Sequence, residues 1–441
     1  MQKVAILGGG ESGVGAAILA KKQGSEVFLS DGGKIQDRFI HILEEYDIPF
    51  EEGKHSIETF FDADIIVKSP GIPEHVPIIQ KLREKNKLII SEIEYGSRYT
   101  QAKIIAITGS NGKTTTTSLI YHLLKSAGVN VALGGNIGKS FAWLVADTDP
   151  DCFVLEISSF QLDDIQNFRP DVAVLLNITP DHLDRYQYSM EKYAAAKFKI
   201  TQNQTAEDTF IFNADDPVSL EEMSKFSILA KQKSFALSNT ENADAWLDDH
   251  QLMVQNKPVA DFQKMLLLGK HNQANTLAAL LAVESYGIDS QLVEKYLFDF
   301  SPIEHRLEKV RNINDITFIN DSKATNVDAV FYALEAVEGP IIWVAGGVDK
   351  GNDYQTLLPF VNEKVKAIVV LGKYIEKFKT SFQKPVFQAQ DMKEGVDKAF
   401  ELAQANDTVL LSPACASFDL FRNYEDRGKQ FKKFVNELSA D

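Results

Sequence analysis

Residues 103–124, KIIAITGSNGKTTTTSLIYHLL, constrain the fold of this chain more than any other segment. The first six residues are mostly apolar and β-branched, which predicts a short buried strand. Apolar side chains then recur at helical spacing, and a glycine predicts where that helix ends; these residues are Leu119, Ile120, Leu123, Leu124 and Gly128. Strand, glycine turn and helix in this order form the unit of an α/β fold, and the free N–H groups at the helix N-terminus attract phosphate.

The turn departs from the usual ATP-binding loop, G-x-x-x-x-G-K-S/T. Gly112, Lys113 and Thr114 fit the end of that pattern, but Ile107 stands at the position of the first glycine and the nearer glycine is Gly109. The alternative is an ordinary turn with a surface lysine. A lysine here can reach the β- and γ-phosphates and the threonine hydroxyl can ligate Mg²⁺, so we interpret the segment as a working nucleotide site.

Strand and helix patterns alternate along the 441 residues, which predicts an α/β fold of parallel sheets in about three domains. We place the boundaries at 1–98, 99–302 and 303–441, because each of these blocks begins with a new strand after a polar stretch. The first and third are expected to be Rossmann-like, and the central block is expected to be a P-loop-type ATPase domain.

Composition narrows the possible functions and compartments. Lys and Arg number 46 against 62 Asp and Glu, a formal net charge of −16, which argues against binding to nucleic acid or to an anionic membrane. No apolar run reaches the length of a membrane helix, and the N-terminal MQKVAILGGG reads as a strand rather than a signal peptide. The cytoplasm is therefore the expected compartment. Cys152 and Cys415 give neither a disulfide framework nor metal-ligand spacing.

The first block contains a second glycine turn between a strand and a helix, formed by Gly8, Gly10 and Gly13. Asp31 follows the next strand at about the distance expected for a contact to ribose. By itself this pattern indicates NAD or FAD, but such a turn serves any nucleotide diphosphate, and glycines that only permit close packing remain the alternative. The turn KSPGIP, residues 68–73, ends another strand at the edge where α/β sheets bind ligands.

The second block holds the candidate chemistry. Glu156 ends the apolar strand CFVLE, where a carboxylate is costly to bury unless it is paired or faces a ligand such as Mg²⁺. His182 lies just beyond the strand DVAVLLNI, with Asp181 and Asp184 beside it. Lys197 follows three alanines on a predicted helix, and from the residues alone it reads as a solvated helix lysine.

Ten motifs in this chain occur in the same order in the Mur ligases, and the resemblance covers all three blocks. They are TGSNGKTT, GNIG (135–138), EISSFQL, NITPDHLDRY, AAKFKI, NADDP, GKHNQAN (269–275), EHR (304–306), NDSKATN (320–326) and SPACASFDLF (412–421). NDSKATN and SPACAS resemble the members that add D-glutamate rather than alanine, a diamino acid or a dipeptide. The resemblance also implies that the displaced glycine is this family's own form of the phosphate loop.

The resemblance implies roles for individual residues at the ATP and metal sites. Lys113, His182 and Lys197 match catalytic residues, and Thr114, Glu156, His182 and Lys197 match the ligands of two Mg²⁺ ions, with Lys197 carrying a carbamate. A carbamate suits such a place because an ammonium beside Mg²⁺ would be repelled. The residues that match contacts to ATP are Gly109, Ser110, Asn111, Gly112, Lys113, Thr114, Thr115, Asn272, His305, Arg306 and Asp321.

Substrate contacts are implied in the same way. Ser12, Asp31, Ser69, Gly71 and Asn136 match the site for a UDP-sugar, so the first block would hold uridine diphosphate instead of a dinucleotide. The D-glutamate end is matched by Lys323, Thr325, Lys350, Ser417, Phe418 and Tyr424. The chain departs from the expected pattern at Glu11, an anion close to a diphosphate, at Gly32 and Gly33, which offer no side chain to uracil, and at Phe418 and Tyr424.

The resemblance implies an ATP-dependent amide ligase that adds D-glutamate to UDP-N-acetylmuramoyl-L-alanine through an acyl phosphate, in the synthesis of a peptidoglycan precursor. ATP, two Mg²⁺ ions and the lysine carbamate are the implied cofactors. The partners would be the small-molecule substrates alone, with no nucleic acid or membrane, and a monomer is expected. Three alternatives stay open: a nicotinamide-dependent oxidoreductase, a non-catalytic nucleotide sensor, and a related ligase that adds another amino acid.

Overall fold

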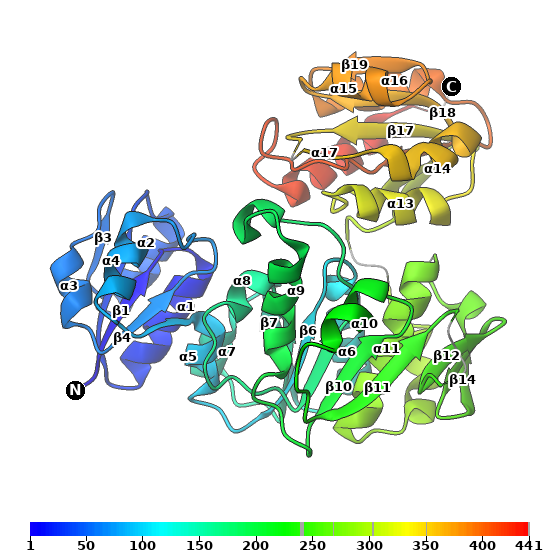
Figure 1. The fold of residues 1–441 in the computed structure, drawn as a ribbon. Coiled ribbons are helices and arrows are strands. Elements are labelled where there is room, and N and C mark those ends of the chain that lie inside the picture. The colour runs from blue at the N-terminus through cyan, green and yellow to red at the C-terminus, as the bar shows by residue number, and fades with distance from the viewer. Residues whose placement is uncertain (239–241, 268, 302–303, 350, 440–441) are drawn as a thin grey trace. The chain divides into compact units, whose positions relative to one another are not determined.

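The computed structural model describes residues 1–238, 242–267, 269–301, 304–349 and 351–439 (Figure 1). The chain forms two compact units. The first comprises Met1–Phe262 and Ala274–Phe298, and the second comprises Gln263–Gln273 and Asp299–Asp441. The predicted division at 98 falls inside the first unit, which holds two sheets, and residues 302 and 303 lie outside the described residues. The boundaries at 98 and 302 therefore stay predictions.

The N-terminal sheet of the first unit is parallel, in the strand order β3-β2-β1-β4-β5. Its strands are β1 (Lys3–Leu7), β2 (Glu26–Asp31), β3 (Phe50–Glu52), β4 (Ile65–Lys68) and β5 (Ile89–Ser91), and its helices are α1 (Glu11–Lys22), α2 (Asp37–Glu45), α3 (Ile57–Asp62), α4 (Pro77–Glu84) and α5 (Glu92–Ser97). The strand order reverses between β1 and β4, and ligands bind at such a point in open α/β sheets. Gly8 follows β1 and Ser69 follows β4, so both glycine-containing turns of the first block lie at this point.

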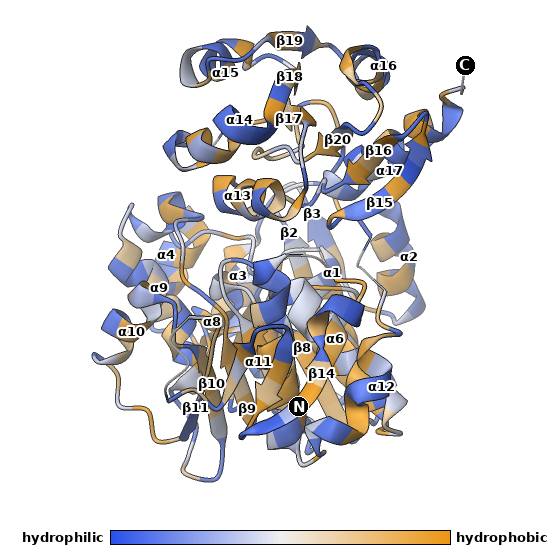
Figure 2. Ribbon diagram, turned by 90° about the vertical axis from the view of Figure 1, so that its right-hand side faces the viewer, coloured by the Kyte–Doolittle hydropathy of each residue, from blue (hydrophilic) through white to orange (hydrophobic). Residues whose placement is uncertain are grey.

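The central sheet has nine strands in the order β14-β13-β12-β11-β10-β9-β6-β8-β7. The strands are β6 (Lys103–Thr108), β7 (Val131–Gly135), β8 (Cys152–Glu156), β9 (Val172–Leu175), β10 (Thr209–Asn213), β11 (Lys231–Ala236), β12 (Ala245–Asp248), β13 (Gln251–Val254) and β14 (Lys257–Asp261). Apolar residues fill the middle strands (Figure 2), and Phe153 and Ala173 are fully buried there. β6 pairs with both β8 and β9, so Ile107 lies opposite Glu156 and Thr108 opposite Leu175.

The helices of this region are α6 (Lys113–Ser126), α7 (Phe141–Asp147), α8 (Ser159–Leu162), α9 (Met190–Phe198), α10 (Pro217–Met223), α11 (Lys270–Tyr286) and α12 (Glu294–Leu297), with the 3₁₀ turns η1 (Leu183–Tyr186), η2 (Lys199–Thr201), η3 (Phe262–Lys264) and η4 (Ser290–Val293). None of the helices in the described residues is long and apolar enough to cross a membrane.

The expectation of parallel pairing throughout is wrong at one edge of the central sheet and also at one edge of the sheet in the second unit. β12, β13 and β14 pair antiparallel, through tight turns at Asp249 and at Gln255 and Asn256, all of which adopt positive φ. Two-residue turns permit only antiparallel neighbours, because a parallel pair requires a crossover of a dozen or more residues.

The second unit holds a six-stranded sheet in the order β15-β16-β20-β17-β18-β19, in which the β15–β16 pair is antiparallel and the others are parallel. The strands are β15 (Glu308–Ile313), β16 (Ile316–Asn320), β17 (Ile341–Gly346), β18 (Val365–Leu371), β19 (Val386–Ala389) and β20 (Thr408–Leu411), and the helices are α13 (Val327–Ala336), α14 (Leu358–Lys364), α15 (Ile375–Ser381), α16 (Met392–Leu402) and α17 (Tyr424–Glu437), with the turn η5 (Gln355–Leu357). Asn320 and Val344 both lie opposite Leu411, so Asp321 and Ser412 leave the sheet together.

Candidate active site

The phosphate-loop candidate connects β6 to α6. β6 continues to Thr108, so Ile107 is a buried strand residue and cannot be part of the turn. Gly109 and Gly112 instead supply the backbone freedom, with φ of +149° and +86°. A Cβ on Gly112 would stand 2.3 Å from Asn275 Oδ1, so glycine is required there by space as well as by conformation. The first glycine is displaced from its usual position because β6 extends through Thr108, which leaves a shorter turn than the usual G-x-x-x-x-G-K-S/T pattern has.

A second segment, after β9, holds this loop in place. The Asn177 carbonyl accepts a hydrogen bond from Ser110 N at 2.9 Å, and its side chain accepts from Asn111 N at 2.8 Å and donates to Asn111 O at 3.1 Å. Ser110 Oγ donates to Thr179 O at 2.9 Å. Sequence reasoning missed Asn177 and Thr179. Their position in the sequence could have identified them, because both follow β9, and β9 pairs with β6, the strand that leads into the loop.

Two lysines converge on the loop. Lys113 Nζ donates to Gly109 O at 2.7 Å and to Ser110 O at 2.8 Å, and Lys197 Nζ donates to Gly109 O at 2.9 Å. Lys197 is 2% exposed and its ammonium lies 4.5 Å from the centre of the Tyr193 ring, so the interpretation of a solvated helix lysine is wrong. Burial, and secondarily the charge of Lys113, hold the pKa of Lys197 well below its usual value, against a smaller opposing effect of Asp181.

Glu156, the last residue of β8, is 3% exposed beside the same loop. One carboxylate oxygen, Oε1, accepts from Asn136 Nδ2 at 2.8 Å, and the Glu156 carbonyl accepts from Asn136 N at 2.8 Å. Among the described residues no donor reaches the other oxygen, Oε2. A buried carboxylate oxygen without a donor is costly, and a bound cation would compensate for it. Thr114, at the start of α6, is likewise buried.

His182 immediately precedes the turn η1 and has a left-handed φ of +52°. Its ring lies edge-on to Phe160, 5.2 Å between centroids, and its Nε2 is 3.6 Å from Asp181 Oδ2. The described residues contain no group of three or more His, Cys, Asp or Glu arranged to hold a metal ion. The predicted donor set of Thr114, Glu156, His182 and Lys197 therefore fits Mg²⁺ only if Lys197 contributes oxygen, because Mg²⁺ prefers oxygen ligands and an ammonium offers none.

A cavity of about 500 Å³ lies at the reversal point of the N-terminal sheet. Four of the predicted substrate residues line it together, Ser12, Asp31, Ser69 and Gly71, and Glu11 also faces it. The Asp31 carboxylate accepts hydrogen bonds from Gly9 N at 2.6 Å and Gly33 N at 2.7 Å, so it also fixes the two turns that border the cavity. Asn136 is not among the lining residues and instead contacts Glu156.

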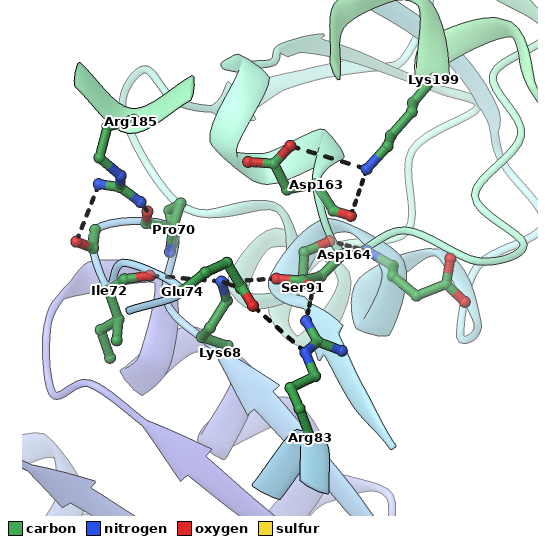
Figure 3. A network of polar contacts seen from close by, with 12 residues as sticks. Lys68, Pro70, Ile72, Glu74, Arg83, Ser91, Asp163, Asp164, Arg185 and Lys199 are labelled. Carbon is green, nitrogen blue, oxygen red and sulfur yellow. Dashed lines mark hydrogen bonds and ion pairs between the residues drawn. The ribbon is translucent and has the colours of Figure 1, made fainter. Parts of the chain in front are cut away.

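Side chains of the central sheet's loops hold the 68–73 turn of this cavity (Figure 3). Lys68, 4% exposed, forms ion pairs with Glu74 Oε1 at 2.5 Å and with Asp164 Oδ2 at 2.8 Å, and Arg83 also pairs with Asp164. Arg185, three residues after His182, donates to Pro70 O at 3.3 Å and Gly71 O at 3.4 Å. The turn beside the cavity is therefore tied to the segment that carries His182.

The second unit brings together the other ATP candidates. The buried Asp321 carboxylate accepts from Ser412 Oγ at 2.8 Å and Leu307 N at 3.3 Å, and burial raises its pKa to about 7 against the opposing effects of Ser412 and Arg306. His305 is buried, with Nδ1 2.9 Å from Asn320 Nδ2, and Arg306 Nε is buried without a hydrogen-bond partner in the described residues.

Asn272 belongs to the same unit, and its neighbour lies close to Arg306. His271 is buried, and burial together with the charge of Arg306 lowers the pKa of its imidazole to about 4. His271 of the GKHNQAN segment therefore lies near enough to Arg306 of the EHR segment for the arginine's charge to act on it.

Two loops carry the candidates for the amino-acid end. Arg427, fully buried, donates to Ser322 Oγ at 3.0 Å, Ser322 O at 2.8 Å and Cys415 O at 3.1 Å, and so joins the NDSKATN loop to the SPACAS loop. Sequence reasoning missed it, because a buried arginine on α17 has no local signal. Lys323 Nζ lies 5.3 Å from the centre of the Tyr424 ring.

The remaining candidates of this group differ in exposure. Ser417 is buried, Thr325 is half-buried and Phe418 is 74% exposed. Lys350 lies outside the described residues.

Comparison with known proteins covers the whole chain. Residues 107–283 match the Mur ligase middle domain, residues 305–415 match the Mur ligase glutamate ligase domain, and residues 3–78 match the MurD N-terminal domain. The UDP-N-acetylmuramoylalanine–D-glutamate ligase of Bacteroides fragilis is 51% identical, over 99% of this chain and 100% of that protein. The ligase of the same name from Christiangramia forsetii is 49% identical, with the same coverage of both chains.

Solved structures agree on the fold. A pseudomurein peptide ligase type C from Methanothermus fervidus superposes with a TM-score of 0.66 at 19% identity, covering 100% of both chains. That likeness supports the architecture alone. With half of the residues shared with curated relatives over their full length, and with all three domain matches in order, the chain belongs to the Mur ligase family.

Proposed function

We propose that this chain joins D-glutamate to UDP-N-acetylmuramoyl-L-alanine, with conversion of ATP to ADP and phosphate, in the cytoplasmic synthesis of a peptidoglycan precursor. The names of the curated relatives support this choice of substrates. The observation that carries the proposal is the convergence of Lys113 and the buried Lys197 on Gly109 O, next to a Glu156 oxygen that lacks a donor among the described residues. A simple nucleotide sensor has no need of that arrangement.

The proposed reaction has two steps. The alanyl carboxylate of the UDP substrate attacks the γ-phosphorus of ATP, and ADP leaves, giving an acyl phosphate. The amine of D-glutamate then attacks the acyl carbon, and inorganic phosphate leaves as the amide forms and the amine loses a proton. In the first step the loop N–H groups and the Lys113 ammonium stabilise charge on the phosphoryl oxygens.

Thr114, Glu156, His182 and a carbamylated Lys197 are the proposed holders of two Mg²⁺ ions. Bound there, the ions would offset negative charge on the phosphates of ATP. The carbamate forms when the neutral Lys197 amine attacks CO₂ and releases a proton. The low pKa of Lys197 supports this step, because only an uncharged amine has the lone pair that attacks CO₂.

The remaining assignments divide between the two units. In the first unit, the cavity lined by Ser12, Asp31, Ser69 and Gly71 would take the uridine diphosphate, and Asn136 would act beside Glu156. In the second, Asn272, His305, Arg306 and Asp321 would contact ATP, and the D-glutamate end would use Lys323, Thr325, Lys350, Ser417, Phe418 and Tyr424. The chain would act as a monomer without nucleic acid or membrane.

The test is release of phosphate from ATP in the presence of UDP-N-acetylmuramoyl-L-alanine and one amino acid at a time. We expect release with D-glutamate, little with L-glutamate, and none without the UDP substrate. Equal turnover with both enantiomers, or preference for another amino acid, would assign the chain a different ligase reaction. Tight binding of NADH would support the oxidoreductase alternative instead.

A further inference from the structure

The nucleotide cavity contains a histidine that no sequence motif singled out. His55 lines the cavity in the loop after β3, and its Nε2 lies 3.1 Å from the point where a Cβ on Gly32 would stand. Gly32 therefore leaves the space that the imidazole occupies. An edge-on contact with Phe60, 6.3 Å between ring centroids, supports the ring from another side. The chain thus has a ring nitrogen at the place where Gly32 and Gly33 offer no side chain.

The loop that carries His55 is fixed to the end of β2. β3 pairs with β2 in parallel, with Ser30 opposite Glu51. Beyond the strands, Gly53 N donates to Gly33 O at 3.0 Å. In sheets of this topology the nucleoside of a bound nucleotide lies beyond the end of the second strand, while its phosphates lie at the first glycine turn. His55 consequently faces the nucleoside end of the cavity.

Hydrogen bonds behind the ring determine which of its nitrogens carries the proton. Ser30 Oγ lies 2.8 Å from Glu51 Oε1, 3.1 Å from Lys54 O and 2.7 Å from His55 Nδ1. Burial would raise the pKa of Glu51, but hydrogen bonds from Ser56 and Ser30 outweigh it and lower the pKa below its usual value. Glu51 is therefore ionised and can only accept.

The hydroxyl of Ser30 has a single proton, and both Glu51 and the Lys54 carbonyl can only accept it. Ser30 must then accept the hydrogen bond from His55, so Nδ1 carries the imidazole proton. In a neutral imidazole with Nδ1 protonated, Nε2 is an acceptor. The relay Glu51–Ser30–His55, in which Ser30 is buried and the other two are half-buried, thus presents a hydrogen-bond acceptor to the cavity.

We infer that His55 selects uracil, by accepting at Nε2 a hydrogen bond from N3–H of the base. Uracil carries a proton on N3, whereas N3 of cytosine is itself an acceptor and would face the Nε2 lone pair. The inference rests on the proposed function, because it takes this cavity to hold the uridine diphosphate part of the substrate. It adds a specificity-determining residue and explains how a chain with Gly32 and Gly33 recognises the base.

The test is calorimetric binding of UDP and of CDP to the full-length wild type and to His55→Phe. We expect the wild type to bind UDP about 10-fold more tightly than CDP, since the mismatched base leaves two acceptors facing each other. In His55→Phe the two affinities should become equal through loss of UDP affinity. His41→Phe is the matched control, because His41 lies on α2 beside the same sheet and its side chain is 79% exposed. This variant should keep the wild-type preference for UDP over CDP.

In steady-state assays His55→Phe should raise KM for the UDP substrate and leave kcat and KM for ATP unchanged. The tautomer gives an independent readout. ¹⁵N NMR of histidine-labelled wild type, with His55 assigned by its absence in His55→Phe, should show protonation at Nδ1. Ser30→Ala keeps the imidazole but removes the relay, and it should shift the proton toward Nε2 and weaken the preference for UDP.

Equal affinities for UDP and CDP in the wild type, an Nε2–H tautomer, or a preference for UDP retained in His55→Phe would each overturn the inference. If His55→Phe fails to fold, the wild-type tautomer and Ser30→Ala decide the matter. Phosphate release with D-glutamate alongside equal UDP and CDP affinities would refute the inference and leave the proposed function standing. A preference for UDP over CDP in a protein that releases no phosphate would refute the proposed function and leave the inference about His55 standing.

Discussion

Lys113 and Lys197 donate to one carbonyl oxygen, that of Gly109, at 2.7 and 2.9 Å. Two ammonium groups at this separation repel each other, and Lys197 is fully buried whereas Lys113 is partly exposed and also bonds to Ser110 O. The proton is therefore less favourable on Lys197, in agreement with its lowered pKa. The loop thus places a partly exposed lysine beside a buried lysine whose lowered pKa favours the unprotonated amine.

Lys113→Ala is expected to lower kcat for phosphate release by about 100-fold or more, because it removes a cation from the developing charge on the phosphates. Binding of UDP should persist, since the cavity at the N-terminal sheet does not include Lys113. Lys125→Ala, an exposed lysine on the same helix, is the control and should retain activity. Turnover within a few-fold of wild type in Lys113→Ala would show that this loop is not the catalytic phosphate site.

Lys197→Ala is expected to abolish nearly all activity, and acetate or formate should restore part of it by placing carboxylate oxygens in the space left behind. Lys197→Arg should stay inactive, because arginine keeps the positive charge. Lys192→Ala, exposed on the same helix, should be active and indifferent to acetate. A ¹³C-bicarbonate NMR signal from a carbamate should appear in the wild type with Mg²⁺ and nucleotide and be missing in Lys197→Ala; its absence from the wild type would refute the modification.

Lys197 should also make stability depend on pH. In the unfolded chain a lysine keeps its proton up to its ordinary pKa of 10.5, whereas the folded protein binds that proton only at much lower pH. Unfolding therefore takes up a proton, and the free energy of unfolding falls as pH decreases below 10.5. Lys197→Met removes this dependence.

In CO₂-free buffer, urea titrations from about pH 7 to about pH 10 should show Lys197→Met more stable than wild type at the lower end, with the difference shrinking toward the upper end. A difference that stays constant across the series would mean that Lys197 is charged in the folded protein.

Lys68 and Asp164, which form an ion pair behind the 68–73 turn, should be strongly coupled in their contributions to stability (Figure 3). Asp164→Asn leaves the buried Lys68 with the half-exposed Glu74 as its one direct ion-pair partner among the described residues, which we expect to destabilise the fold and raise KM for the UDP substrate. Lys68→Met in the same chain should recover part of the loss. A double-mutant cycle by urea unfolding should give a coupling energy of about 1 kcal/mol or more; additive effects would show that the pair is not a unit.

The sequence by itself determined the parts of the site whose signals are local. A β-branched strand, two glycines and a helix start predicted the loop 109–115. The glycine turn with Asp31 predicted the location of the cavity at the N-terminal sheet, because parallel sheets bind ligands at the carboxyl ends of their strands. The ends of two further predicted strands indicated Glu156 and His182, and the family resemblance added their role as magnesium ligands. These predictions needed no knowledge of which distant segments touch.

Only the tertiary structure decided what depends on packing between distant segments. The strands β12 to β14 pair antiparallel at the edge of the central sheet, and Asn177 binds the loop 109–115. The contact of Ser30 with His55 Nδ1 leaves Nε2 of that ring for the cavity. Lys197 shows the reason most clearly. It shares a helix face with Tyr193 and Ala194, both buried, but an amine on an apolar face can be solvated or enclosed. Which of the two occurs is set by the loop that packs over it, 88 residues away.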